Sequence, residues 1–238
     1  MRNIFIVLFC LCMSLIGTMI GALIGVSIKN PSKNFLGFIF SFAAGLMLMV
    51  SAFELIPEAI EVSNMKSFLV FFSIGILTIL IINYFSAYYT KDNNIKIALL
   101  ISLGIMLHNF PEGLIMGVGF MAGGNLGLKM SILIAIHDIP EGISVAAPLK
   151  YSKVSSTRIM IYAFLTALPA LIGSLVGIFL GSISDLAIGA SLSIAAGIML
   201  YVTLFEMIPK SREICGVKIC TLGLVIGSVI GMCMIVFM

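Results

Sequence analysis

Charged residues are scarce in this sequence. Only 10% of its 238 residues are Asp, Glu, Lys or Arg, whereas soluble globular domains have about 25%. Hydrophobic residues make up 61%, above the ordinary value of about 45–50%. So little charge excludes a water-soluble domain, and the composition predicts an integral membrane protein.

Tryptophan is absent, and the five cysteines follow no pattern of pairing. Cys10, Cys12 and Cys233 lie inside apolar segments, while Cys215 and Cys220 lack the spacing of a zinc finger. This argues against a disulfide framework and against a cysteine-based zinc site. We interpret the cysteines as small buried hydrophobic residues.

The apolar residues form segments long enough to cross a bilayer, which takes about 20 residues in a helix. We identify eight: 4–28, 35–56, 67–90, 97–121, 127–148, 158–182, 185–208 and 217–238. The first exceeds the apolar region of a typical signal peptide, so we expect an uncleaved span. Only short polar connections remain. The sequence therefore predicts an all-α integral membrane protein in which residues 1–238 form a single polytopic domain.

The lysines and arginines predict the orientation of this domain, because cationic residues collect in cytoplasmic loops. With the amino terminus outside, three fall in the outer loops, namely Arg2, Lys66 and Lys129. The inner loops hold ten, namely Lys29, Lys33, Lys91, Lys96, Lys150, Lys153, Arg158, Lys210, Arg212 and Lys218. We therefore expect both termini on the extracytoplasmic side of the cell membrane.

Two segments repeat each other closely. Residues 41–57 read SFAAGLMLMVSAFELIP and residues 193–209 read SIAAGIMLYVTLFEMIP, with 11 of 17 positions identical. Chance similarity between apolar helices would not align both a glutamate and a proline. The predicted orientation makes these two spans, the second and the seventh, antiparallel. We therefore expect an inverted repeat with halves of about 4–121 and 127–238, in a 3+2+3 arrangement with its substrate site at the midplane.

The only two histidines begin two similar hexapeptides, HNFPEG at 108–113 and HDIPEG at 137–142. Each hexapeptide lies near the middle of a predicted span, where an acidic residue costs roughly 2.5–3.5 kcal/mol. Positions i and i+4 of a helix share a face, so each histidine points the same way as the glutamate of its motif. Imidazole, carboxylate and amide groups together suit zinc, iron and manganese. The candidate ligands are His108, Asn109, Glu112, His137, Asp138 and Glu141.

Glu54 and Glu206 are the acidic residues of the repeated segments. They could be symmetry-related acids near the two mouths of the pathway that draw cations in and release them. They could equally be solvated acids at helix ends, or acids that pair across a dimer. The sequence leaves these alternatives open.

Glycines recur every four residues in the first and sixth spans. Such rows are typical of close helix packing, and we favour this interpretation over a role in gating. The rows are Gly17, Gly21 and Gly25, and Gly173, Gly177 and Gly181.

The paired hexapeptides resemble those of the Zrt/Irt-like protein (ZIP) family of divalent metal transporters, closest to its short prokaryotic members. The resemblance covers nearly the whole chain, including eight spans and outward termini. It implies a primary site of His108, Glu112, His137 and Glu141, with Asn109 and Asp138 forming a second site bridged by Glu112. It also implies uptake of Zn²⁺ into the cytosol, with Fe²⁺, Mn²⁺ and Cd²⁺ as further candidates.

On this resemblance the metal ion is the transported substrate, and we expect neither a prosthetic group nor an enzymatic activity. The expected partners are divalent metal ions and the lipid bilayer, without nucleic acid, and the resemblance allows a homodimer. Many family members carry a glutamate in the sixth span. The matching residues here, 166–170 (TALPA), have no ionisable group, which leaves the number of bound ions open.

Two other functions fit the sequence less well. An intramembrane zinc hydrolase would use similar ligands around an activated water, but zincins have the order His-Glu-x-x-His, and here the order is His-x-x-x-Glu. A proton-coupled carrier of organic solutes would leave the doubled histidine motif unexplained.

Overall fold

The computed structural model describes residues 2–28, 32–89, 95–122, 125–151 and 153–237, and helices account for nearly all of them. No strand occurs in these ranges, so the prediction of an all-α protein is confirmed. In chain order the elements are α1 (Arg2–Ser27), α2 (Lys33–Val50), η1 (Ser51–Leu55), α3 (Ile56–Ser63), α4 (Met65–Tyr89), α5 (Ile95–Ala122), α6 (Leu126–Tyr151), α7 (Ser156–Gly181), α8 (Asp185–Tyr201), η2 (Val202–Met207) and α9 (Ile208–Phe237).

Several helical stretches have the length and composition needed to cross a membrane. Among the described residues there are five: Phe5–Ser27, Lys33–Ser63, Leu126–Ala147, Ser156–Gly181 and Asp185–Phe237. Large apolar side chains such as Leu77, Phe179 and Val229 are exposed on the outside, where they would face lipid. This distribution and the apolar helices suit a multi-pass membrane protein.

Two helical stretches continue beyond the predicted ends of their apolar segments. The second predicted segment was expected to end at residue 56, but α3 extends the helical stretch to Ser63. The seventh was expected to end at residue 208, but α9 continues through the polar residues that follow until Gly216, whose φ of 77° and ψ of 169° interrupt the helix. Hydropathy marks where a segment becomes polar, whereas a helix continues until its backbone turns.

Each copy of the repeated sequence contains one π-helical turn, η1 in the first and η2 in the second. In η1 the Ile56 N–H donates to the Ser51 carbonyl, and in η2 the Ile208 N–H donates to the Thr203 carbonyl. The two turns therefore share the same register as well as the same sequence. Both acidic residues of the repeat, Glu54 and Glu206, lie within them.

A proline follows each π turn, Pro57 after η1 and Pro209 after η2. Proline has no N–H, and in a regular helix its ring would collide with the carbonyl four residues earlier. π turns occur mostly as single turns inside longer α-helices, as η1 and η2 do here. Each π turn ends two residues before a proline, whereas Pro111 and Pro169 lie inside α-helices without a π turn.

Glycines allow α1 to pack directly against α6, and α5 directly against α7. A Cβ added at Gly21 would run into the carbonyl oxygen of Ile139, and one added at Gly173 would run into that of Phe110. These contacts lie beside the two histidine motifs, which occupy α5 and α6. The structure agrees with the packing interpretation of both glycine rows.

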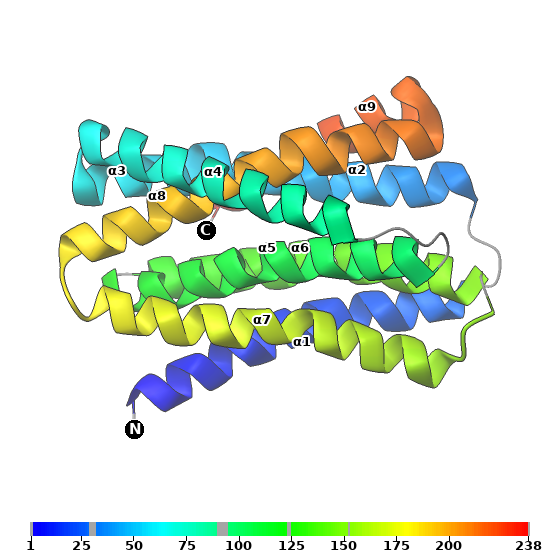
Figure 1. Cartoon of the computed structure of the whole chain (residues 1–238), viewed down its shortest axis with the longest axis horizontal. Coiled ribbons are helices and arrows are strands. Elements are labelled where there is room, and N and C mark those ends of the chain that lie inside the picture. The colour runs from blue at the N-terminus through cyan, green and yellow to red at the C-terminus, as the bar shows by residue number, and fades with distance from the viewer. Residues whose placement is uncertain (1, 29–31, 90–94, 123–124, 152, 238) are drawn as a thin grey trace.

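The same kind of contact joins α2 to the end of α9, and α4 to α8. A Cβ at Gly227 would meet the Phe42 carbonyl, and one at Gly75 would meet the Ile194 carbonyl. Figure 1 shows α2, α3, α4 and α9 along one side of the molecule, and α1, α5, α6 and α7 along the other. Helices α5 and α6 carry the histidine motifs; α6 contacts α2 of the first side, and α5 contacts α8.

The close contact between α1 and α6 predicts a strong effect of a side chain at Gly21. In Gly21→Val the added atoms would meet the backbone of α6, and overpacking of this kind costs about 1–3 kcal/mol. We expect a lower apparent Tm for the purified protein in detergent. The control is Ile24→Val, because Ile24 is 41% exposed on the same helix. Equal Tm values for the two variants would contradict this account of the contact.

Candidate metal centre

Three candidate ligands from the two motifs converge in the interior. Glu112 comes from α5, and His137 and Glu141 come from α6. Each offers one ligand atom, and these three atoms lie within 4.8 Å of one another. Their exposed fractions are 0%, 1% and 3%. Two antiparallel segments of sequence thus supply one compact group of metal-ligating side chains.

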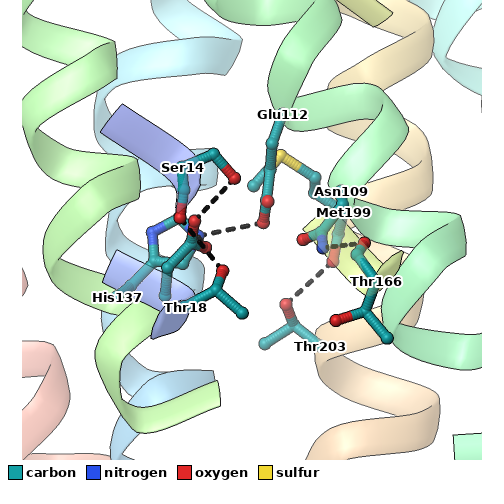
Figure 2. A network of polar contacts seen from close by, with 9 residues as sticks. Ser14, Thr18, Asn109, Glu112, His137, Thr166, Met199 and Thr203 are labelled. Carbon is teal, nitrogen blue, oxygen red and sulfur yellow. Dashed lines mark hydrogen bonds and ion pairs between the residues drawn. The ribbon is translucent and has the colours of Figure 1, made fainter. Parts of the chain in front are cut away.

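The contact between Glu112 and His137 joins the two motifs. His137 Nε2 lies 2.9 Å from Glu112 Oε1, and Figure 2 shows the two side chains pointing toward each other from opposite helices. An imidazole and a carboxylate at this distance satisfy each other where no water is available. The contact keeps both side chains directed toward the same point.

Asp138 lies beside this pair and has two different oxygens. Its Oδ1 lies 3.6 Å from His137 Nε2, while its Oδ2 accepts a hydrogen bond of 2.9 Å from the Ser14 hydroxyl of α1. Both Asp138 and Ser14 are fully buried. Asp138 therefore borders the group of Glu112, His137 and Glu141, and α1 contributes a donor to it.

Asn109 is held by α7, the helix whose residues 166–170 carry no ionisable group. Its Nδ2 donates a 2.6 Å hydrogen bond to the Thr166 carbonyl of α7, and the Thr166 hydroxyl donates back to Ala163 of its own helix. The amide oxygen of Asn109 is thereby turned away from α7. Figure 2 shows Asn109 and Thr166 together on the side of the site where Thr203 also lies.

His108 lies on α5 one turn before Glu112, but its side chain is outside the described part of the chain. Its membership of the site therefore stays a prediction. The other five candidate ligands are all buried and all lie on α5 or α6.

Several buried polar atoms of the site have no hydrogen-bond partner within the described residues. They are Asn109 Oδ1, His137 Nδ1 and Asp138 Oδ1. A buried polar atom left without a partner costs about 1–3 kcal/mol, so a group of them calls for an explanation. A bound cation would satisfy lone pairs of this kind, and it would also offset the three buried carboxyl groups of Glu112, Asp138 and Glu141.

Glu54 and Glu206 stand apart from this group. Glu54 forms an ion pair of 2.9 Å with Lys129 near the start of α6, and both side chains are partly exposed. Glu206 occupies the equivalent position in η2. The structure thus gives Glu54 a cationic partner within the chain, which the sequence alternatives did not include.

Sequence reasoning missed Ser14 and Thr166. Ser14 precedes Gly17 by three residues and Thr18 by four, so it continues the small-residue face of α1. That position was a usable signal for Ser14. Thr166 acts through its backbone carbonyl, which no residue type reveals.

Known proteins resemble this chain over most of its length. The sequence model of the family described as "ZIP Zinc transporter" matches residues 93–238, which include both motifs. A protein named zinc transporter ZupT from Enterobacter sp. (strain 638) is 31% identical over 88% of this chain and 92% of its own length. The protein of the same name from Salmonella paratyphi A is also 31% identical, over 90% of this chain and 94% of its own.

The geometry predicts that removing one carboxylate weakens metal binding. Glu112→Gln retains the shape of the side chain but loses its charge, so we expect Zn²⁺ affinity to fall at least about tenfold, which corresponds to 1.4 kcal/mol. Isothermal titration of Zn²⁺ into the purified protein measures this. The matched control is Glu213→Gln, because Glu213 is exposed and pairs only with Lys210 among the described residues. Wild-type affinity in Glu112→Gln would exclude Glu112 as a ligand.

Proposed function

The chain belongs to the ZIP family of zinc transporters, and on this premise we propose that it carries divalent transition-metal cations across the cytoplasmic membrane into the cytosol. Zn²⁺ is the foremost substrate, and Fe²⁺, Mn²⁺ and Cd²⁺ are further candidates. As a member of this family the protein is a transporter and not an enzyme. The observation that carries the proposal is the buried group of Glu112, His137 and Glu141.

We assign the transport site to His108, Asn109, Glu112, His137, Asp138 and Glu141. The convergence of Glu112, His137 and Glu141 supports a primary site that uses imidazole and carboxylate ligands, a combination that binds zinc readily. The oxygens of Asn109 and Asp138 would extend the site on either side of Glu112. Because α7 offers no acid at residues 166–170, a second ion would meet fewer charges than the first.

The proposed architecture has eight spans in a 3+2+3 inverted repeat, within a single domain of residues 1–238 whose two termini are extracytoplasmic. Its halves are about 4–121 and 127–238. Helix packing supports this, because exchanging α1 with α7 and α6 with α5 turns the α1–α6 contact into the α7–α5 contact. Exchanging α2 with α8, and the end of α9 with α4, likewise turns the α2–α9 contact into the α8–α4 contact. The matching π turns η1 and η2 are a further point of support.

Transport in this scheme exchanges the waters of an incoming ion for the ligands of the site, followed by release on the cytosolic side. The side of the molecule with α1, α5, α6 and α7 carries the ligands, and α8 and the side with α2, α3, α4 and α9 border it. Movement of one side relative to the other would open the site alternately to the two faces of the membrane, as inverted repeats allow. A homodimer is compatible with this scheme.

Uptake of radiolabelled Zn²⁺ by cells that express the chain tests the proposal. We expect wild-type cells to accumulate Zn²⁺ above the vector control, because the site binds the ion during its passage. The double variant Glu112→Ala/Glu141→Ala removes two of the three converging ligands, so its uptake should fall to the vector level. Competition by unlabelled Cd²⁺, Fe²⁺ and Mn²⁺ in proteoliposomes ranks the substrates.

The control for that experiment is Glu213→Ala, which removes an exposed acid. Membrane insertion of each variant is checked on the same cells by surface labelling. Uptake equal to the wild type by a correctly inserted double variant would refute the site assignment.

Protons should compete with the metal ion at this site. Carboxylate and imidazole ligands bind metal in their deprotonated forms, so affinity falls as the pH falls and binding releases protons. We expect weaker Zn²⁺ binding at about pH 5.5 than at about pH 7.5, because the ligands are protonated in acid. Titration in two buffers with different ionisation enthalpies measures the number of protons released. An affinity that does not change over this range would contradict binding by these side chains.

A further inference from the structure

The Ser14 hydroxyl of α1 donates a hydrogen bond to a carboxylate of another helix, that of Asp138 in α6. The other buried serines and threonines mainly donate to carbonyls of their own helix, such as Thr18 to Ser14 and Ser193 to Gly189. This internal bond is the ordinary choice for a hydroxyl in a helix. Ser14 instead donates across the helix boundary to Asp138 Oδ2 at 2.9 Å.

The backbone holds this hydrogen bond in place. A Cβ added at Gly17, three residues after Ser14, would lie 2.7 Å from Asp138 Cβ. Helix α1 therefore lies directly against the backbone of α6 at Asp138, and neither helix can shift without opening this contact. Since α1 and α6 pack along each other through Gly21 and Gly25 as well, we expect them to move together during transport.

The bond makes the two oxygens of Asp138 inequivalent. Oδ2 faces α1 and accepts from Ser14, whereas Oδ1 lies 3.6 Å from His137 Nε2 and has no hydrogen-bond partner in the described part of the chain. Only Oδ1 is therefore directed toward the group of Glu112, His137 and Glu141. Figure 2 shows Ser14 on the His137 side of the site, opposite Asn109 and Thr166.

We propose that Ser14 is a positioning residue that holds Asp138 as a ligand through one oxygen, and thereby favours Zn²⁺ over larger ions. This inference rests on the metal site proposed above. Zn²⁺ in proteins prefers four ligands in a tetrahedron, and a carboxylate held through one oxygen suits that number. Mn²⁺ prefers six oxygen-rich ligands, so it gains when both oxygens of the carboxylate become available.

The proposal differs from a purely structural role for the hydroxyl. A structural role would affect all metals alike through the position of α1. A role through Asp138 affects metals unequally, and it disappears when Asp138 is absent. Both differences can be measured on the full-length protein.

The test uses purified wild-type protein, Ser14→Ala, and the matched control Ser174→Ala. Ser174 is also fully buried, but it donates to Leu171 of its own helix. We expect Ser14→Ala to lower Zn²⁺ affinity about 10–100-fold, the usual effect of losing a group that orients a ligand. Mn²⁺ affinity should fall less, so the ratio of Mn²⁺ to Zn²⁺ affinity rises. Ser174→Ala should match the wild type for both metals.

The same substitution is then made in an Asp138→Ala background. Because Ser14 acts through Asp138, we expect Ser14→Ala to cause no further loss of Zn²⁺ affinity there, in the manner of a double-mutant cycle. Three results would overturn the proposal: Zn²⁺ affinity in Ser14→Ala equal to the wild type, parallel losses for Zn²⁺ and Mn²⁺, or the same loss with and without Asp138. In each of these the wild type still binds and carries Zn²⁺. Failure of the wild type to do so would instead overturn the proposed function and this inference with it.

Discussion

The contact between Glu112 and His137 is the constraint on which the rest of the structure depends. A carboxylate and an imidazole at membrane depth need partners, because lipid offers no hydrogen bonds and little screening. Their separation of 2.9 Å requires α5 and α6 to approach closely in the centre of the protein. The surrounding helices must then enclose both without gaps. Glycines in α1 and α7 meet this requirement, because they let backbone lie directly against backbone.

The two π turns show how a repeated sequence produces a repeated backbone. Pro57 and Pro209 each follow a glutamate by three residues, and each widened turn ends two residues before its proline. The turns therefore bring Glu54 and Glu206 to equivalent positions in the two halves. Their environments need not be equal, since Glu54 reaches Lys129 on α6. An approximate symmetry of the backbone thus leaves room for different chemistry at its two ends.

The proposed transport site combines candidate charged ligands with neutral groups that contact them. Ser14 donates to Asp138, and the Thr166 carbonyl accepts from Asn109. Helix α7, which carries no acid at residues 166–170, thus contributes to the site through its backbone. Orienting groups of this kind commonly matter to metal affinity nearly as much as the ligands themselves. The chemistry of the proposed transport site therefore extends from α5 and α6 to α1 and α7.

The sequence by itself determined that the protein is a helical membrane protein, because long apolar segments with so few charges have no other stable arrangement. It also determined the candidate ligands, because acids and histidines in apolar helices are costly and stand out. It could not determine the two π turns or the pairing of Glu54 with Lys129. Only the tertiary structure brought Ser14 to Asp138 and the Thr166 carbonyl to Asn109. Those contacts join residues 124 and 57 positions apart, and such distances are decided by helix packing, which local sequence patterns do not record.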